Sequence, residues 1–278
     1  MEFVDTHCHI HEIAAPVHHD EDSHNGGPSM YERWNKAGKT AEGVITDAGE
    51  AGVTRLMCVG CTTADSELAV DFVKGRENLW ASIGIHPHEA EFHGNKPDLL
   101  KKFADLATQP KVVAVGECGL DYYYNHSPKA DQEKMLRFQI ELALQHDLPM
   151  IFHVRDAFDD FWKVVDDYQN IRGVVHSFTA GEKELGQILA HGLHVGLNGI
   201  MTFTKNDAQL AAAKAVPLDR LLLETDAPFL TPAPKRNEIC EPKHVRTTAE
   251  FLAHIRGESL VDLAAATTQN ATALFNFK

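Results

Sequence analysis

Residues 111–121 read KVVAVGECGLD, and this segment gives the clearest indication of the fold. After Lys111 it is a run of valine, alanine and glycine, which is typical of a strand that is buried on both faces. Glu117 follows this run directly. The stretch therefore predicts a buried parallel strand that carries a carboxylate at its end.

Similar apolar runs recur along the whole chain, and amphipathic stretches separate most of them. The other seven runs are FVD at Phe3, RLMCVG at Arg55, LWASIGI at Leu79, PMIFHV at Pro149, GVVHSF at Gly173, LHVGLN at Leu193 and LLLETD at Leu221. We expect helices at 63–75, 131–147 and 243–255. Eight buried strands alternating with helices in 278 residues predict a (β/α)8 TIM barrel, a fold that takes about 250 residues. A doubly wound open sheet is the alternative, but its dinucleotide-binding version has no support because no G-x-G-x-x-G follows the first run.

One segment, residues 12–43, interrupts this rhythm between the first strand and the next helix. It is polar, rich in histidine and glycine, and far longer than an ordinary βα loop. In a barrel it would lie on the active-site face, as a lid or as a plain surface loop. A third metal site there, which we do not favour, would use His18, His19, Asp20, Asp22 and His24. No linker divides the chain, so we expect one domain over residues 1–278.

Composition narrows the partners and the compartment. Forty acidic against 26 basic residues give a net charge of −14, which disfavours a broad basic face for duplex DNA and suits attack on strand ends or short oligonucleotides. No apolar run reaches the roughly 20 residues that cross a bilayer. An odd count of five cysteines argues against a disulfide framework. We therefore expect a cytoplasmic protein with no membrane partner, and a monomer rather than an obligate oligomer.

Polar side chains gather at the carboxyl ends of the predicted strands, where barrel active sites form. They are His7 and His9 after the first strand, Glu117 at the fourth, His153 at the fifth, His176 at the sixth and Asp226 after the eighth. Each alone is typical of a helix cap or a hydrogen-bonded histidine. Six of them at one end of the barrel indicate a metal site, because purely structural residues would lie at both ends.

The ligand set indicates two divalent ions. Four histidines and two carboxylates exceed the needs of one tetrahedral ion, whereas a bridging carboxylate between two ions would use them all. We expect Glu117 to bridge, with His7, His9 and Asp226 on one ion and His153 and His176 on the other. These ligands suit zinc, manganese, iron or nickel and can also accept magnesium, and the sequence does not choose among them.

The chain resembles the TatD-type deoxyribonucleases, metal-dependent hydrolases with an amidohydrolase-like barrel. The matching motifs are DTHCH at Asp5, GIHPHEA at Gly84, GECGLDYYY at Gly116, PMIFHVRDAF at Pro149, VVHSFTAG at Val174, NGIMTF at Asn198, LLLETDAPFLTP at Leu221, KRNE at Lys235 and TTQNATALF at Thr267. The resemblance implies a TIM barrel, two divalent metals on the same six residues, and removal of nucleotides from DNA 3′ ends. The long segment 12–43, Thr204 before Lys205, and the run of KRNE into ICEP depart from the family pattern.

The expected reaction is attack of a metal-bound hydroxide on a phosphodiester, with Asp226 orienting the nucleophile and accepting its proton. Candidate substrate-binding residues are Arg155, His86, His88, Lys205 and Arg236. A tyrosine of 122–124 would stack on a base or pack the loop. Two alternatives stay open: an amidohydrolase-like enzyme for a small phosphoester, lactone or amide, and a non-catalytic metal-binding scaffold. The absence of a lysine where Glu117 stands favours the nuclease.

Overall fold

The computed structural model describes residues 1–17 and 28–277 and contains one eight-stranded parallel sheet. The strands are hydrogen-bonded in chain order: β1 (Phe3–Cys8), β2 (Val53–Val59), β3 (Leu79–Ile83), β4 (Val112–Asp121), β5 (Met150–Arg155), β6 (Gly173–Val175), β7 (His194–Leu197) and β8 (Leu221–Leu223). The sheet curls until its last strand returns to its first. Cys8 pairs with Ala227 just after β8, and Asp226 N donates to His7 O over 2.8 Å. The predicted (β/α)8 barrel is confirmed.

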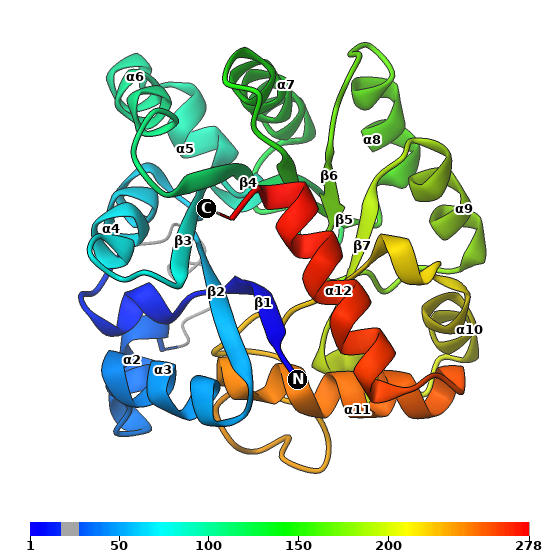
Figure 1. The fold of residues 1–278 in the computed structure, drawn as a ribbon. Coiled ribbons are helices and arrows are strands. Elements are labelled where there is room, and N and C mark those ends of the chain that lie inside the picture. Colours follow the sequence, from blue (N-terminus) through cyan, green and yellow to red (C-terminus); the bar gives the residue numbers. More distant parts are fainter. Residues whose placement is uncertain (18–27, 278) are drawn as a thin grey trace.

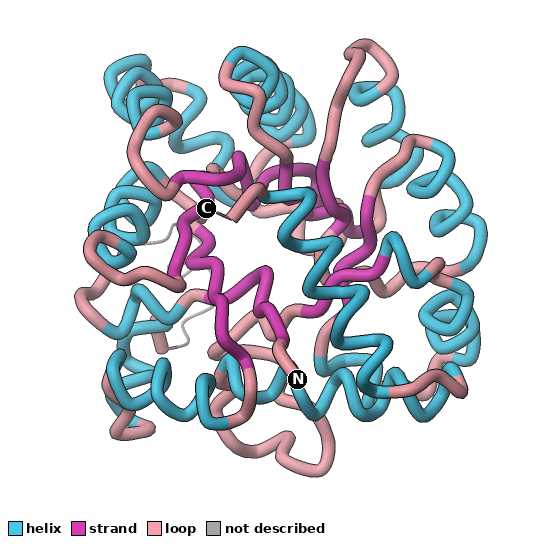
Figure 2. Tube along the Cα trace, viewed as in Figure 1, coloured by secondary structure: helices cyan, strands magenta, loops and turns pink. Residues whose placement is uncertain are grey.

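Helices form a ring outside the strands (Figures 1 and 2). They are α2 (Met30–Lys36), α3 (Ala41–Glu50), α4 (Thr63–Val73), α5 (Ala90–Gly94), α6 (Pro97–Leu106), α7 (Lys129–Gln145), α8 (Phe158–Val165), α9 (Glu182–Ala190), α10 (Asp207–Ala215), α11 (Val245–Arg256) and α12 (Leu260–Phe275). The three helices predicted from periodicity are confirmed as α4, α7 and α11, with ends that differ by a few residues. No disulfide links the five cysteines, which all lie in the described ranges and are buried.

The barrel interior is closed at one end. Its apolar core consists of side chains from alternating strand positions together with three from the last helix, namely Val4, Met57, Val59, Ala114, Ile151, Val174, Leu222, Ala271, Leu274 and Phe275. Helix α12 packs on β1 and β8 and crosses the amino-terminal opening of the barrel, in red at the front of Figure 1. The carboxyl ends of the strands are left for a functional site.

Part of the segment 12–43 is helical, which the sequence analysis did not expect. Ser29 caps α2 by accepting from Glu32 N, and the Glu32 carboxylate accepts from Ser29 N, so the two form a capping box. The indole of Trp34 on α2 is fully buried. Because this anchor fixes α2 to the barrel, residues 30–36 form a packed wall rather than a surface loop. The candidate third metal site at 18–24 lies outside the described residues.

Strands β1, β4 and β5 extend further than predicted. The sequence pattern predicts that this strand ends at Glu117, but β4 continues to Asp121 because its pairing with β5 continues to the partners Asp121 and Arg155. His7 likewise lies within β1, and His153 within β5. The extension brings Asp121 and Arg155 to the same end of the barrel as the candidate metal ligands.

Candidate metal centre

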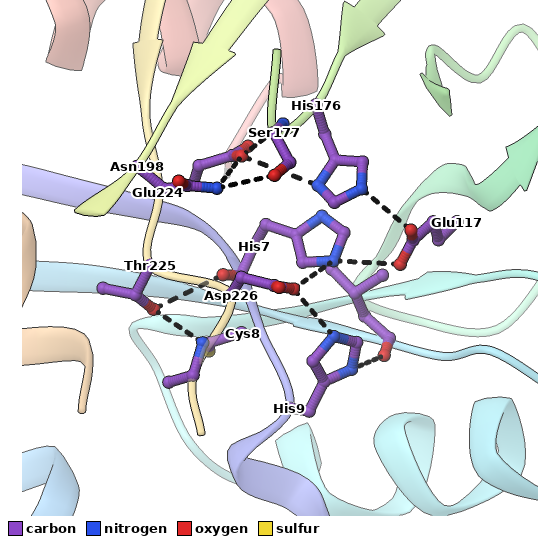
Figure 3. A network of polar contacts seen from close by, with 12 residues as sticks. His7, Cys8, His9, Glu117, His176, Ser177, Asn198, Glu224, Thr225 and Asp226 are labelled. Atoms are coloured by element: carbon purple, nitrogen blue, oxygen red, sulfur yellow. Dashed lines mark hydrogen bonds and ion pairs between the residues drawn. The ribbon is translucent and has the colours of Figure 1, made fainter. Parts of the chain in front are cut away.

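The six predicted ligands meet at the carboxyl end of the barrel, and Figure 3 shows five of them, namely His7, His9, Glu117, His176 and Asp226. Glu117 Oε2 lies 3.2 Å from His7 Nε2, and Glu117 Oε1 lies 2.8 Å from His176 Nε2 and 2.7 Å from His153 Nδ1. Asp226 Oδ1 lies 3.5 Å from His9 Nε2 and 3.6 Å from His7 Nε2. Two sets of ligand atoms therefore surround one carboxylate, one set at each of its oxygens.

Glu117 is brought to this position by close packing of strand ends. A Cβ at Gly84, just after β3, would collide with the backbone of Gly116 and Glu117, so only glycine allows the approach. Burial acts to raise the pKa of Glu117, but the charge of His176 and hydrogen bonds from His153 and His176 lower it well below its ordinary value. The side chain is thus an anion buried among imidazoles, which is the state that a cation needs.

Three of the histidines have an acceptor on the side away from Glu117 and Asp226. His9 Nδ1 hydrogen-bonds Val59 O at 2.8 Å, His153 Nε2 hydrogen-bonds Asp121 Oδ2 at 3.0 Å, and His176 Nδ1 faces Glu224 Oε1 at 3.5 Å. An acceptor on the far nitrogen holds the proton there and leaves the near nitrogen with a lone pair. The near nitrogens are Nε2 of His9 and His176 and Nδ1 of His153.

Asp121 and Glu224 contact two of the candidate ligands and were not predicted from the sequence, although both lie in quoted motifs. Asp121 Oδ1 also accepts from Tyr123 N and Tyr124 N, at 3.0 and 2.9 Å. Glu224 Oε1 accepts from Ser177 N at 2.6 Å and from the Asn198 amide at 3.3 Å. Each carboxylate is therefore fixed by the backbone or by a side chain, and can fix an imidazole in turn.

Asp226 is held at the edge of the site by the barrel closure. Its backbone adopts φ 64° and its amide donates to His7 O. The preceding residue, Thr225, donates through Oγ1 to the buried Asp5 over 2.6 Å. The Asp226 side chain is 18% exposed, whereas that of Glu117 is 6% exposed. Asp226 is thus the ligand carboxylate that a substrate or water can reach.

The donor set fits metal ions. His7 is fully buried, and its Nε2 faces two carboxylates at 3.2 and 3.6 Å without a hydrogen bond to any described residue. A buried polar atom without a partner is costly in a protein, and a cation between His7, Glu117 and Asp226 would remove that cost. Two groups made up of predicted ligands each place their ligand atoms within 4.8 Å of one another: His7, His9 and Glu117; His7, His176 and Asp226.

A cavity of about 590 Å³ opens over this centre. Arg155 and Tyr124 line it, together with the apolar side chains of Met30, Ile200, Phe229 and Leu230. Met30 belongs to α2, so the helical part of segment 12–43 reaches the site. The cavity is large enough for a substrate of nucleotide size and offers it both polar and apolar contacts.

The candidate substrate-binding residues separate into two groups. Arg155, His86 and His88 line the cavity. Lys205 and Arg236 do not, and the Arg236 guanidinium lies 3.4 Å from the Phe203 ring centre and donates to Thr231 O. The structure therefore brings three of the five to the metal candidates.

His86 contacts the centre through Glu117 rather than as a ligand. Its Nδ1 accepts from His88 N at 3.3 Å, which leaves the proton on Nε2, 3.4 Å from Glu117 Oε1. Burial, with the nearby charge of His88, lowers the pKa of His86 to about 4, so the ring is neutral near pH 7. A neutral ring with its proton on Nε2 can orient the Glu117 carboxylate but has no lone pair there for a metal.

Known proteins resemble this chain over most of its length. The sequence profile described as TatD related DNase matches residues 4–276. The chain is 32% identical to the Escherichia coli protein named uncharacterized metal-dependent hydrolase YcfH, over 99% of this chain and 96% of that protein. It is 37% identical to the 3′-5′ ssDNA/RNA exonuclease TatD of Cronobacter sakazakii, over 84% of this chain and 90% of that protein. The solved structure of YjjV, a TatD homolog from Escherichia coli, superposes with a TM-score of 0.82 at 25% identity, covering 99% of this chain and 98% of that one.

The helices give no sign of a membrane span. Among the described residues, none is both long enough and apolar enough to cross a bilayer.

Proposed function

The chain belongs to the TatD family of metal-dependent hydrolases, and we propose that it removes nucleotides from the 3′ ends of single-stranded DNA. This proposal rests on the position of the Glu117 carboxylate, whose two oxygens face separate sets of imidazoles. Such a shared carboxylate is the layout of two-metal phosphoryl hydrolases. The relatives named as 3′-5′ exonucleases support the polarity.

We propose that two divalent cations bind here. His7, His9, Glu117 and Asp226 would hold one, and Glu117, His153 and His176 the other. Bound cations of this kind activate water and offset charge on the phosphoryl oxygens. Zinc, manganese and magnesium are the candidates: the imidazole ligands favour zinc, whereas the carboxylate ligands suit manganese and magnesium.

Asp226 is the residue that we propose to handle the proton. Its carboxylate is more exposed than that of Glu117, and it lines the cavity. The hydrogen bond from its backbone amide to His7 O and the contact of Thr225 with Asp5 fix its position. Its carboxylate can therefore orient a water molecule and accept a proton at Oδ2. His86 would keep Glu117 oriented meanwhile.

Arg155 and His88 are proposed to contact the substrate, because both line the cavity beside the metal candidates. Arg155 offers a planar guanidinium, which suits a phosphate group. Lys205 and Arg236 stay sequence-based proposals that only a longer strand would reach.

Digestion of end-labelled DNA tests the proposed function. Metal-stripped protein would be incubated with 3′-labelled and 5′-labelled single strands, with magnesium, manganese or zinc added in turn. We expect metal-dependent, stepwise loss from the 3′ end, and none from the Asp226→Asn variant. No cleavage with any metal, by protein that binds two ions, would overturn the proposal in favour of a small phosphoester, lactone or amide substrate.

A further inference from the structure

A second cavity, of about 710 Å³, adjoins the cavity over the metal candidates. Val154, Arg155, Thr179 and Gln209 line both. The second cavity lies between the ends of β4 and β5 and the start of α8, and it is bordered by strongly exposed side chains such as Lys163 and Lys183. A continuous path thus leads from the metal centre over Arg155 to the protein surface.

Arg155 stands at the junction without an acidic partner. Its guanidinium carbon lies 4.1 Å from the Tyr123 ring centre and 4.8 Å from that of Tyr124, and it forms no ion pair within the described part of the chain. Arg155 follows His153 by two residues on β5, about 6.6 Å along the strand. A guanidinium so placed can bind the next phosphate along a strand whose cleaved phosphate lies at the metals.

Tyr123 offers a stacking surface beside this guanidinium. It is 59% exposed and Tyr124 is 48% exposed, although both are large aromatic side chains. Their backbone amides bind Asp121 Oδ1, and Asp121 Oδ2 accepts from His153. The same carboxylate therefore fixes both the tyrosine pair and the candidate ligand His153, and so sets the position of the tyrosines relative to that ligand.

The charges of the second cavity suit an anionic strand better than the rest of the surface does. Four basic side chains line it, namely Lys129, Arg155, Lys163 and Lys183, against four acidic ones. The formal charges that line this cavity therefore cancel, whereas the whole chain has a net charge of −14. A strand leaving the metal centre this way meets less repulsion than elsewhere on an acidic protein.

We propose that the second cavity binds the nucleotide on the 5′ side of the cleaved phosphodiester, with its phosphate on Arg155 and its base against Tyr123. The terminal nucleotide occupies the first cavity, and the strand continues to the surface over the second. Stacking on Tyr123 needs an unpaired base, so the site selects single strands. This inference rests on the proposed nuclease function.

A fluorescent base placed in the strand tests this directly. The Asp226→Asn protein, which should bind without cleaving, would be mixed with manganese and DNA that carries 2-aminopurine at the terminal or the penultimate 3′ nucleotide. We expect stacking to quench the fluorescence of the penultimate probe. This quenching should disappear when the protein carries Tyr123→Leu in addition to Asp226→Asn. The matched control is Phe92→Leu, which removes an exposed aromatic ring that lines neither cavity.

Kinetics on otherwise unaltered enzyme provide the second readout. Tyr123→Leu should lower kcat/KM for oligonucleotides about five- to one-hundred-fold relative to Phe92→Leu. Arg155→Gln should reduce the slope of log Kd against log salt by about 0.7, the loss of one phosphate contact. If the wild type shows no metal-dependent cleavage, both proposals fail. If it cleaves but Tyr123→Leu behaves as Phe92→Leu does and Arg155→Gln keeps the wild-type slope, the second cavity is not a nucleotide site and the proposed function stands.

Discussion

Replacing Asp121 by asparagine should weaken one cation site and spare the other. Asp121 uses Oδ1 for the amides of Tyr123 and Tyr124 and Oδ2 for His153 Nε2, over distances of 2.9 to 3.0 Å. An asparagine that keeps its oxygen on the two amides presents its NH₂ group to His153. The imidazole then has to accept at Nε2 and carry its proton on Nδ1, the nitrogen that faces Glu117.

The magnitude follows from the role of such partners. Loss of an outer acceptor on a metal-binding histidine lowers metal affinity about 10- to 100-fold, or about 1.4 to 2.7 kcal/mol. We expect this for the cation shared by Glu117, His153 and His176, and no change for the cation at His7 and His9. Asp105→Asn, which removes an exposed carboxylate far from the site, is the matched control.

Competition titration with a chelating dye measures the two affinities separately. The expected result for Asp121→Asn is one site of unchanged affinity and one weakened site, with an unchanged circular dichroism spectrum. Two sites of wild-type affinity would refute the assignment of Asp121 as the group that orients His153.

Three further changes have defined outcomes. Asp226→Asn should lower kcat about 10²- to 10⁴-fold while leaving the thermal transition near that of the wild type, and near-normal turnover in steady-state assays would remove Asp226 from the proton step. Metal affinity should rise from pH 6 to pH 8, because a proton on His176 competes with the cation at low pH. Burial acts to lower the pKa of His176, but Glu117 and Glu224 raise it well above its ordinary value. Equal affinities at the two pH values, measured by calorimetry, would contradict this. Trp34→Ala should cost about 3 to 5 kcal/mol of unfolding free energy in urea titrations, and a loss below about 1 kcal/mol would mean that α2 is not anchored to the barrel.

The sequence predicts the barrel and the six candidate ligands because both depend on where apolar runs end. Polar groups at strand ends of a closed parallel barrel converge whatever the loops do. The role of Asp121 and Glu224 could not be predicted in this way. Their role depends on which imidazole nitrogen faces inward, and that is set by side-chain rotation rather than by position in the chain.

Loop residues were harder to place. Lys205 and Arg236 follow strands at the expected end, but neither lines the cavity, and Arg236 packs on Phe203 instead. Helix α2 is a different case, because Ser29 and Glu32 form a capping box that is readable in the sequence. The single domain, the monomeric state and the cytoplasmic location stay predictions from the sequence.

Anomalous X-ray scattering from crystals grown with manganese would show whether two cations bind around Glu117. We expect two peaks about 3.5 to 4 Å apart on either side of the Glu117 carboxylate, one beside His7, His9 and Asp226 and the other beside His153 and His176. A single peak, or a second peak away from Glu117, would contradict the two-cation centre.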